Sequence, residues 1–250
     1  MDKALIRNRF AKALDSYPHQ ATVQRDIAVR MTDLIGRYVP QVAHHRVLEI
    51  GCGTGLFTRA YLHRWHPEQM LLNDLCPEVE PYLSDVLRAD VSFSATDAEA
   101  LAFPCGQNLI VSCSALQWFE SPERFLRGCK ALLAEGGYLA FSTFGRRNVR
   151  EVSSLTSDAL PYRSLTDLTG ALSDTYQVVY ASEEEVSFSF ASPLEVLRHL
   201  KATGVTGIRS QTWTKGRLAS FCQNYTARYA APDGTVPLTY HPIYIICVKC

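Results

Sequence analysis

The sequence lacks any excess of charge of one sign. Its 250 residues include 25 Lys and Arg and 25 Asp and Glu, so the formal net charge is zero. Proteins dedicated to nucleic acids usually carry a strong basic excess, so we expect no nucleic-acid partner. The sequence also lacks an apolar run of about 18 residues, the length that a membrane-spanning helix needs, and we expect no membrane association.

A recognisable targeting segment is also missing. Residues 1–10 carry charged side chains and no apolar stretch follows them, unlike a secretory signal peptide. Most of the eight cysteines lie in apolar runs, as small buried hydrophobic residues of a reducing compartment do. Cys247 and Cys250 form a C-x-x-C pair, but no second pair stands at ligand spacing. We therefore expect a cytoplasmic protein with no metal site.

From residue 46 onward, strand-like and helix-like segments alternate. This order is typical of βαβ units and predicts an α/β fold with a doubly wound, mostly parallel, seven-stranded sheet. The predicted strands are 46–50, 70–74, 92–97, 109–113 and 138–143. The predicted helices between them are 55–65, 78–87 and 122–133, the last ended by the glycines at 136 and 137.

The segments on either side of this core suggest additions to a single domain. Apolar residues at helical spacing predict two N-terminal helices within residues 1–40. Further helices are predicted at 164–172, 193–201 and 215–229, one or two strands at 176–190, and a final strand at 241–248. We therefore expect one domain over residues 1–250, with a core sheet of 46–190 and 237–250. Residues 191–236 would form a helical insertion, either a lid or a packed side element.

The strongest local signal is the glycine loop of residues 48–55, Leu-Glu-Ile-Gly-Cys-Gly-Thr-Gly. It follows a predicted strand and opens a predicted helix, the context that a nucleotide-binding loop requires. Its G-x-G-x-G spacing differs from the dinucleotide pattern G-x-G-x-x-G, because residue 56 is Leu. Asp74 ends the next strand, where a carboxylate can accept both ribose hydroxyls, and Asp97 follows the third strand. Together these positions indicate a nucleotide site rather than a structural turn.

Residues 47–55 resemble the first motif of the class I S-adenosylmethionine-dependent methyltransferases, and the resemblance covers residues 46–145. It implies that S-adenosylmethionine is bound and leaves as S-adenosylhomocysteine. Glu49 and the glycine loop would hold its methionine part, Asp74 its ribose and Asp97-Ala98 its adenine. The implied cofactor-binding residues are Glu49, Gly51, Cys52, Gly53, Thr54, Gly55, Asp74, Leu75, Asp97, Ala98 and Ser114.

A narrower resemblance is to the malonyl-acyl-carrier-protein O-methyltransferases of biotin synthesis. The matching segments are Arg9-Phe10 with Tyr17 and Gln20, 114–118, 141–145, 197–204 and 237–241. The segment Gly-Arg-Arg-Asn at 145–148 and the polar third strand depart from that family's pattern. The resemblance implies methylation of the free carboxylate of a malonyl thioester on an acyl-carrier protein. We also expect the protein to be a monomer.

That reaction needs no general base. A malonyl carboxylate is ionised near pH 7, since ordinary carboxyl pKa values are about 4, so we predict no catalytic His or Asp. The substrate carboxylate still needs a receptor, and Arg198 is the candidate, the alternative being a solvated Arg on a helix surface. Tyr17 would close over the reacting centre or pack in the core, and Trp118 would line the acyl pocket or pack in the core. Lys201, Arg146, Arg147 and Arg150 would meet an acidic carrier or be ordinary solvated surface.

Three other functions compete with this one. The chain could methylate a free small carboxylic acid or a quinone precursor. A non-catalytic binding module would have a degraded glycine loop or lack Asp74, and both are intact. A nucleic-acid methyltransferase would have a motif such as Asn-Pro-Pro-Tyr after the fourth strand, where this chain has Ser-Ala-Leu-Gln at 114–117.

Overall fold

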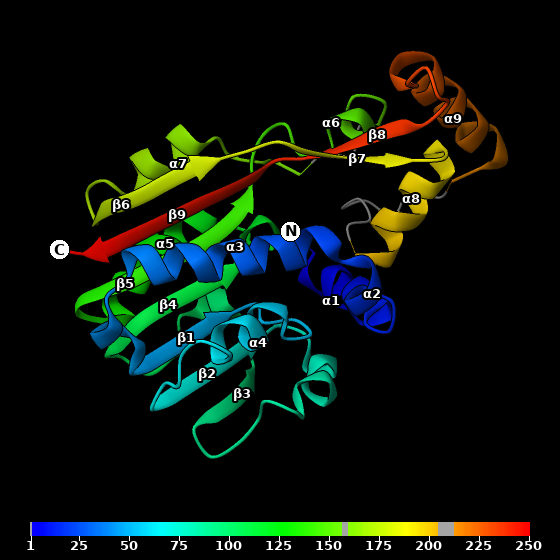
Figure 1. The fold of residues 1–250 in the computed structure, drawn as a ribbon. Coiled ribbons are helices and arrows are strands. Elements are labelled where there is room, and N and C mark those ends of the chain that lie inside the picture. The colour runs from blue at the N-terminus through cyan, green and yellow to red at the C-terminus, as the bar shows by residue number, and fades with distance from the viewer. Residues whose placement is uncertain (1, 157–159, 205–212) are drawn as a thin grey trace.

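Seven strands form one sheet in the order β3-β2-β1-β4-β5-β9-β6 (Figure 1). The computed structural model describes residues 2–156, 160–204 and 213–250. All neighbours from β3 to β5 pair in parallel, and β9 runs antiparallel to both β5 and β6. The strands are β1 (Arg46–Ile50), β2 (Gln69–Asp74), β3 (Val91–Ala95), β4 (Gln107–Cys113), β5 (Leu133–Phe144), β6 (Tyr176–Glu183) and β9 (Pro242–Lys249).

This topology confirms the predicted fold class. The chain moves outward from β1 through β2 to β3, then returns to the other side of β1 with β4. The strand order therefore reverses between β1 and β4. In doubly wound sheets, the crevice beyond the carboxyl ends of the strands at such a reversal is where ligands bind.

Helices cover both faces of the sheet (Figure 1). On one face lie α3 (Thr22–Tyr38) and α4 (Leu56–Leu62), and on the other α5 (Pro122–Leu132) and α7 (Leu165–Leu172). The apolar residues of α3 recur every three or four positions, so one stripe of the helix is buried against the sheet. That stripe comprises Val23, Ile27, Met31 and Leu34.

Two short helices precede α3, in the region where the sequence predicts helix. They are α1 (Lys3–Ala13) and α2 (Tyr17–Gln20). Asp2 caps α1, since its side chain accepts a hydrogen bond from the Leu5 backbone N–H at 3.0 Å. Pro18 lies in the first turn of α2, where a missing N–H costs no helical hydrogen bond.

Residues 186–240 form a separate part of the molecule, here termed the accessory unit. Its strands β7 (Val186–Phe190) and β8 (Val236–Tyr240) pair with each other and not with the seven-stranded sheet. Between them lie α8 (Pro193–Ala202) and α9 (Lys215–Tyr229), and residues 205–212 of the predicted insertion lie outside the described residues. The predicted core boundaries, 46–190 and 237–250, were therefore wrong for both of these strands.

Buried polar contacts fix the accessory unit to the core beside α6 (Arg150–Ser153). The buried carboxylate of Glu151 accepts hydrogen bonds from the backbone N–H of Thr239 at 3.0 Å and from its hydroxyl at 2.5 Å. The Asn148 side chain accepts one from the His241 backbone N–H at 3.1 Å. Pairing buried polar groups in this way avoids the cost of leaving them without partners, and it fixes where β8 ends.

Two predicted helix boundaries also need correction. The segment predicted as an α-helix over 78–87 is a 3₁₀ helix, η2 (Pro77–Leu83), and Pro81 inside it cannot donate the hydrogen bond that an α-helix requires. Helix α5 ends at Leu132 and β5 begins at the next residue, so the glycines at 136 and 137 lie within the strand. The other short 3₁₀ helices are η1 (Gln41–His44), η3 (Ala98–Ala100) and η4 (Leu116–Trp118).

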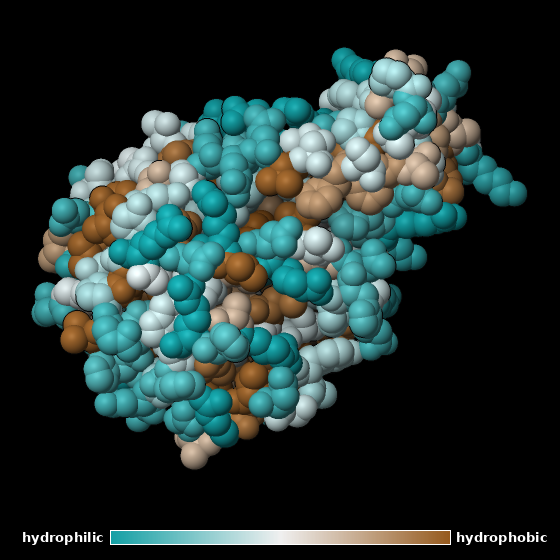
Figure 2. All heavy atoms as spheres, in the orientation of Figure 1, coloured by the Kyte–Doolittle hydropathy of each residue, from teal (hydrophilic) through white to brown (hydrophobic). Residues whose placement is uncertain are grey.

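One face of the molecule is mostly polar. Figure 2 shows hydrophilic residues over most of one face, with hydrophobic ones in small separate groups. Among the described residues, no helix has both the length and the apolar character needed to cross a membrane.

Candidate functional site

A cavity of about 160 Å³ lies at the carboxyl ends of β1, β2 and β4. Its walls come from the glycine loop, from the segments that follow β2 and β4, and from α1, α2 and α3. This is the crevice at the reversal of strand order, where the sequence predicts the nucleotide site.

The glycine loop turns sharply because its three glycines have φ values of 70°, 53° and 79° at Gly51, Gly53 and Gly55. Residues that carry a side chain rarely adopt this left-handed backbone conformation. A Cβ atom on Gly51 would also lie 2.3 Å from the Cβ of Ala115, in the segment after β4. The first glycine is therefore required both by the turn and by the close approach of the neighbouring segment.

Asp74 fixes the glycine loop to the end of β2. One carboxylate oxygen accepts a hydrogen bond from the Gly53 N–H at 2.9 Å, and the other accepts one from the Cys76 N–H at 2.9 Å. The side chain is buried and lines the cavity. Burial raises the pKa of Asp74, and hydrogen bonds from backbone N–H groups act in the opposite direction. Each oxygen keeps lone-pair capacity for a ligand hydroxyl.

Glu49 is a second buried carboxyl group in the wall of the cavity. It is 2% exposed, and its Oε2 accepts a hydrogen bond from the Thr58 hydroxyl at 2.7 Å. Burial raises its pKa to about 8, and the negative charge of Asp74 adds to the effect, while Thr58 and Arg59 act against it. Two acidic groups so placed, without a buried cation beside them, make the cavity suited to a positively charged ligand.

Four buried polar atoms that line this cavity have no hydrogen-bond partner within the described residues. Each such atom carries an unmet desolvation cost of about 1–3 kcal/mol, which a polar ligand would relieve. They lie on α3, on the glycine loop and on the segment after β4, so they surround the cavity from three sides. The atoms are Gln24 Oε1, Thr54 Oγ1, Ser114 Oγ and Gln117 Oε1.

Helices α1 and α2 cover the cavity. Phe10 and Tyr17 both line it, and their rings meet edge to face with centroids 5.2 Å apart. Lys3 forms ion pairs with Asp97 and Glu99, both at 2.6 Å. These contacts hold the N-terminal helices over the opening.

The comparisons with known proteins agree with this geometry. Residues 23–171 match a family model described as "Methyltransferase domain". A malonyl-acyl-carrier-protein O-methyltransferase of Bacteroides thetaiotaomicron is 47% identical over 261 aligned residues, covering 100% of this chain and 99% of that protein. The chain belongs to the malonyl-acyl-carrier-protein O-methyltransferase family. This confirms the family resemblance seen in the sequence.

A relative of the same name from Bacteroides fragilis is 50% identical over 247 residues, which are 99% of this chain. The chain spans about half the length of that relative, since the match covers 50% of it. Among solved structures, a putative methyltransferase of Bacillus halodurans has a TM-score of 0.65 at 14% identity, covering 88% of this chain and 98% of that one. A geranyl diphosphate methyltransferase in complex with S-adenosylmethionine has a TM-score of 0.55 at 12% identity, covering 89% of this chain and 85% of that one. These likenesses show the fold.

The structure brings nearly all predicted cofactor residues of this O-methyltransferase family member to one cavity. Gly55 is the exception, because it turns the chain into α4 without lining the cavity. Tyr17 and Trp118 also line it. The predicted residues in the lining are Tyr17, Glu49, Gly51, Cys52, Gly53, Thr54, Asp74, Leu75, Asp97, Ala98, Ser114 and Trp118.

Arg198 does not lie among the residues that line the cavity. It is exposed on α8, whereas Val196 and Leu200 on the same helix are buried. Its neighbour His199 forms a 2.8 Å hydrogen bond with the Tyr240 hydroxyl. The structure therefore gives no support to Arg198 as the receptor for a substrate carboxylate, and favours the alternative of a solvated helix surface.

The three predicted carrier-binding arginines after β5 are engaged in ion pairs within the chain. Arg146 pairs with Asp167 at 2.7 Å, Arg147 with Glu185 at 2.5 Å, and Arg150 with Glu185 at 2.6 Å. Their positive charge is thus largely compensated by neighbouring carboxylates. Lys201, the fourth candidate, is exposed and has no ion pair in the described part of the chain.

Gln24 and Gln117 are site residues that sequence reasoning missed. Gln24 occupies the buried stripe of α3, beside Ala28 one turn later, and both line the cavity. An amide on an otherwise apolar helix face is a signal that could have revealed it, because buried polar groups need partners. Gln117 carried no such signal, since its burial depends on how η4 folds back beside Ser114, whose carbonyl accepts its amide hydrogen bond at 2.6 Å.

Proposed function

We propose that the chain is an S-adenosylmethionine-dependent O-methyltransferase that methylates the free carboxylate of a malonyl thioester on an acyl-carrier protein. The observation that carries this proposal is the match over almost the whole length of relatives bearing that activity in their name, 47% identical for the one from Bacteroides thetaiotaomicron. The methyl ester would then enter biotin synthesis, as the family resemblance implies.

The cavity residues fit S-adenosylmethionine. This cofactor carries positive charge on its sulfonium and ammonium groups, and the cavity offers the buried carboxyl groups of Glu49 and Asp74. The unpartnered polar atoms of Gln24, Thr54 and Ser114 offer hydrogen-bonding capacity to its polar ends. When bound, the cofactor supplies an electrophilic methyl group.

Each cofactor residue has a proposed task. Glu49 and the glycine loop hold the methionine part, and Asp74 accepts the ribose hydroxyls while keeping the loop in place through Gly53. Asp97 and Ala98 would hold the adenine, and the Asp97 side chain also caps η3 by accepting a hydrogen bond from the Glu99 N–H at 3.1 Å. Ser114, directly after β4, would lie near the methyl group.

The protein contributes orientation and exclusion of water rather than proton transfer. The substrate carboxylate is already ionised near pH 7, so no side chain must remove a proton. Tyr17 is suited to hold one carboxylate oxygen: burial raises the pKa of its hydroxyl, with the charge of Asp74 adding to the effect, so it stays a neutral donor. The other oxygen then remains free to attack. A neutral hydroxyl donor lowers the reactivity of the attacking carboxylate less than an ion pair with a cation would. Binding by Tyr17 therefore does not require Arg198, which lies outside the cavity lining.

Trp118 and the covering helices exclude water from the reacting oxygen. Trp118 lines the cavity from η4, and Phe10 and Tyr17 line it from α1 and α2. Removing water from a charged nucleophile raises its reactivity, because its hydration shell no longer has to be displaced in the reaction step.

Labelled S-adenosylmethionine tests the proposal. The protein is incubated with the labelled cofactor and one of three acceptors: malonyl carrier protein, malonyl-coenzyme A or free malonate. We expect label transfer to a malonyl thioester, with the carrier-bound form preferred. Transfer to free malonate, with none to the thioesters, would replace this function with that of a small-acid methyltransferase.

A further inference from the structure

The accessory unit carries a charge opposite to that of the rest of the chain. Residues 186–240 contain six Lys and Arg against two Asp and Glu, a net charge of +4. The remaining residues contain 19 Lys and Arg against 23 Asp and Glu, a net charge of −4. The zero net charge of the whole sequence is therefore the sum of a positive accessory unit and a negative remainder. Such an uneven charge distribution steers charged partners toward one part of a protein.

The basic side chains of the accessory unit have no acidic partners in the parts of it that the structure describes. Arg198, Lys201 and Lys215 are exposed and form no ion pair. The guanidinium groups of Arg217 and Arg228 lie over aromatic rings instead, 5.2 and 6.0 Å from the ring centroids. Stacking of this kind leaves the positive charge available to a partner. These five side chains are termed the basic surface below.

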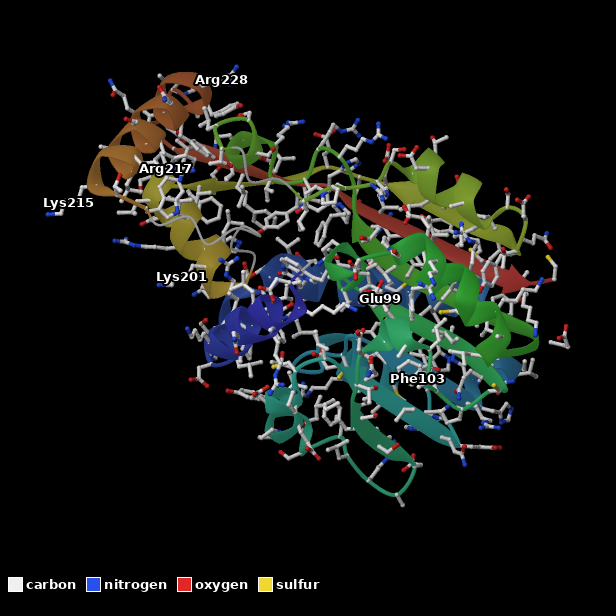
Figure 3. The ribbon with its side chains drawn as sticks, turned by 180° about the vertical axis from the view of Figure 1, so that it is seen from behind. Glu99, Phe103, Lys201, Lys215, Arg217 and Arg228 are labelled. Atoms are coloured by element: carbon white, nitrogen blue, oxygen red, sulfur yellow. The ribbon has the colours of Figure 1, made fainter. Side chains whose placement is uncertain are left out.

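One end of the basic surface, at Lys201, lies next to the cavity. Helix α8 carries Lys201 in its last turn, and the residues that follow it, Thr203 and Gly204, line the cavity. The Ser16 hydroxyl, beside α2, donates a hydrogen bond to the Ala202 carbonyl at 3.0 Å, so the end of α8 is tied to the cover of the cavity. Figure 3 shows Lys201 and Lys215 extending outward at the end of the molecule that the accessory unit forms.

We propose that the basic surface is the docking site for the acidic carrier protein; this inference rests on the proposed function. A small acidic protein can cover the accessory unit while avoiding the negative remainder of the chain. Its thioester arm then enters the cavity past Thr203 and Gly204. A long polyanion such as a nucleic acid fits less well, because it would extend onto the acidic core. We no longer assign carrier binding to the arginines at 146, 147 and 150, because they already form ion pairs with Asp167 and Glu185.

The test compares two double variants of the full chain. The first carries Lys201→Glu and Lys215→Glu on the basic surface. The matched control carries Arg37→Glu, in the last turn of α3, and Arg124→Glu, in the first turn of α5. All four residues are exposed, form no ion pair in the described ranges and lie outside the cavity lining. Each pair has one residue in the last turn of a helix and one in the first turn of another. Both variants therefore change the net charge equally and affect the helix ends in the same way.

The variants are assayed with malonyl carrier protein and with a small malonyl thioester that has no protein attached. At low ionic strength we expect the KM of the basic-surface variant for the carrier substrate to be at least ~10-fold higher than that of the wild type. Its KM for the small thioester should stay within about twofold of the wild-type value. The control variant should match the wild type on both. Raising the salt to about 0.3 M should bring the wild-type KM for the carrier toward that of the basic-surface variant.

Two outcomes would overturn the docking site: equal losses on both substrates, or equal effects of the two double variants on the carrier substrate. Binding of fluorescently labelled malonyl carrier protein is measured in parallel by anisotropy. A wild-type protein that methylates neither thioester would refute the proposed function. Even if neither thioester is methylated, carrier-protein binding that weakens only in the basic-surface variant would support the docking site.

Discussion

The buried carboxyl group of Glu49 predicts that the cofactor displaces a proton when it binds. With a pKa of about 8, the group is about 0.9 protonated at pH 7 before the cofactor binds. The positive charge of S-adenosylmethionine favours the ionised form, so Glu49 should be almost fully ionised in the complex at both pH 6 and pH 7. Binding at pH 7 should therefore release about 0.9 proton, and the affinity should rise about tenfold between pH 6 and pH 7.

Isothermal titration calorimetry in two buffers of different ionisation enthalpy measures this proton directly. The control is Glu49→Gln, which keeps the size of the side chain and an acceptor for the Thr58 hydroxyl. It should bind the cofactor more weakly and lose the proton release linked to Glu49. Zero proton release by the wild type at pH 7, together with an affinity independent of pH from 6 to 7, would refute this reasoning about Glu49.

The same group should make the cofactor-free protein less stable as the pH rises. The pKa of Glu49 is higher in the folded protein than in the unfolded chain, where it is near 4.5. Its contribution is therefore most favourable below about pH 4.5 and is lost as the pH rises toward 8, reaching a cost of about 3 kcal/mol at pH 7. Glu49→Gln should remove up to that cost, so denaturation should show a gain in stability alongside the loss of cofactor affinity.

Three further predictions concern the loop, the ribose site and the chemistry. Asp74→Ala should weaken cofactor binding by about 1.5–3 kcal/mol in calorimetry, and an unchanged affinity would contradict its assigned role. Gly51→Ala should lower the free energy of unfolding by about 1–3 kcal/mol, because its Cβ would lie 2.3 Å from Ala115 Cβ at a φ of 70°; chemical denaturation measures this, and wild-type stability would mean that the loop can shift. With both substrates saturating, single-turnover rates should stay flat from pH 6 to 8, and a steep rise with an apparent pKa near 7 would reveal a required base.

Much of the cofactor site could be predicted from the sequence because it depends on local order. Two features can be recognised from short stretches of sequence: the strand-loop-helix context of residues 48–55, and the position of Asp74 at a strand end. In a parallel sheet the carboxyl ends of successive strands meet at one edge, so residues far apart in sequence converge there. That rule brought Glu49, Asp74 and Asp97 together without any structure.

The substrate side was harder because it depends on non-local packing. The ion pairs of Arg147 and Arg150 with Glu185 require that the end of β6 lie beside the segment after β5, which no local pattern indicates. The alternation of Val236–Tyr240 resembles the start of the last strand, yet it pairs with β7. The exposed position of Arg198 follows from the local pattern, because Val196 and Leu200 share a helix face and a residue two positions from both lies on the opposite side.

Mass spectrometry of intact malonyl carrier protein after reaction tests the central claim most directly. We expect a mass gain of one methyl group in place of one hydrogen, found on the malonyl carboxyl by fragmentation of the released acyl arm. The gain should require S-adenosylmethionine and should fall sharply with Asp74→Ala. A methyl group found on a side chain of the carrier, or an unmodified malonyl group after complete turnover of the cofactor, would contradict carboxyl O-methylation.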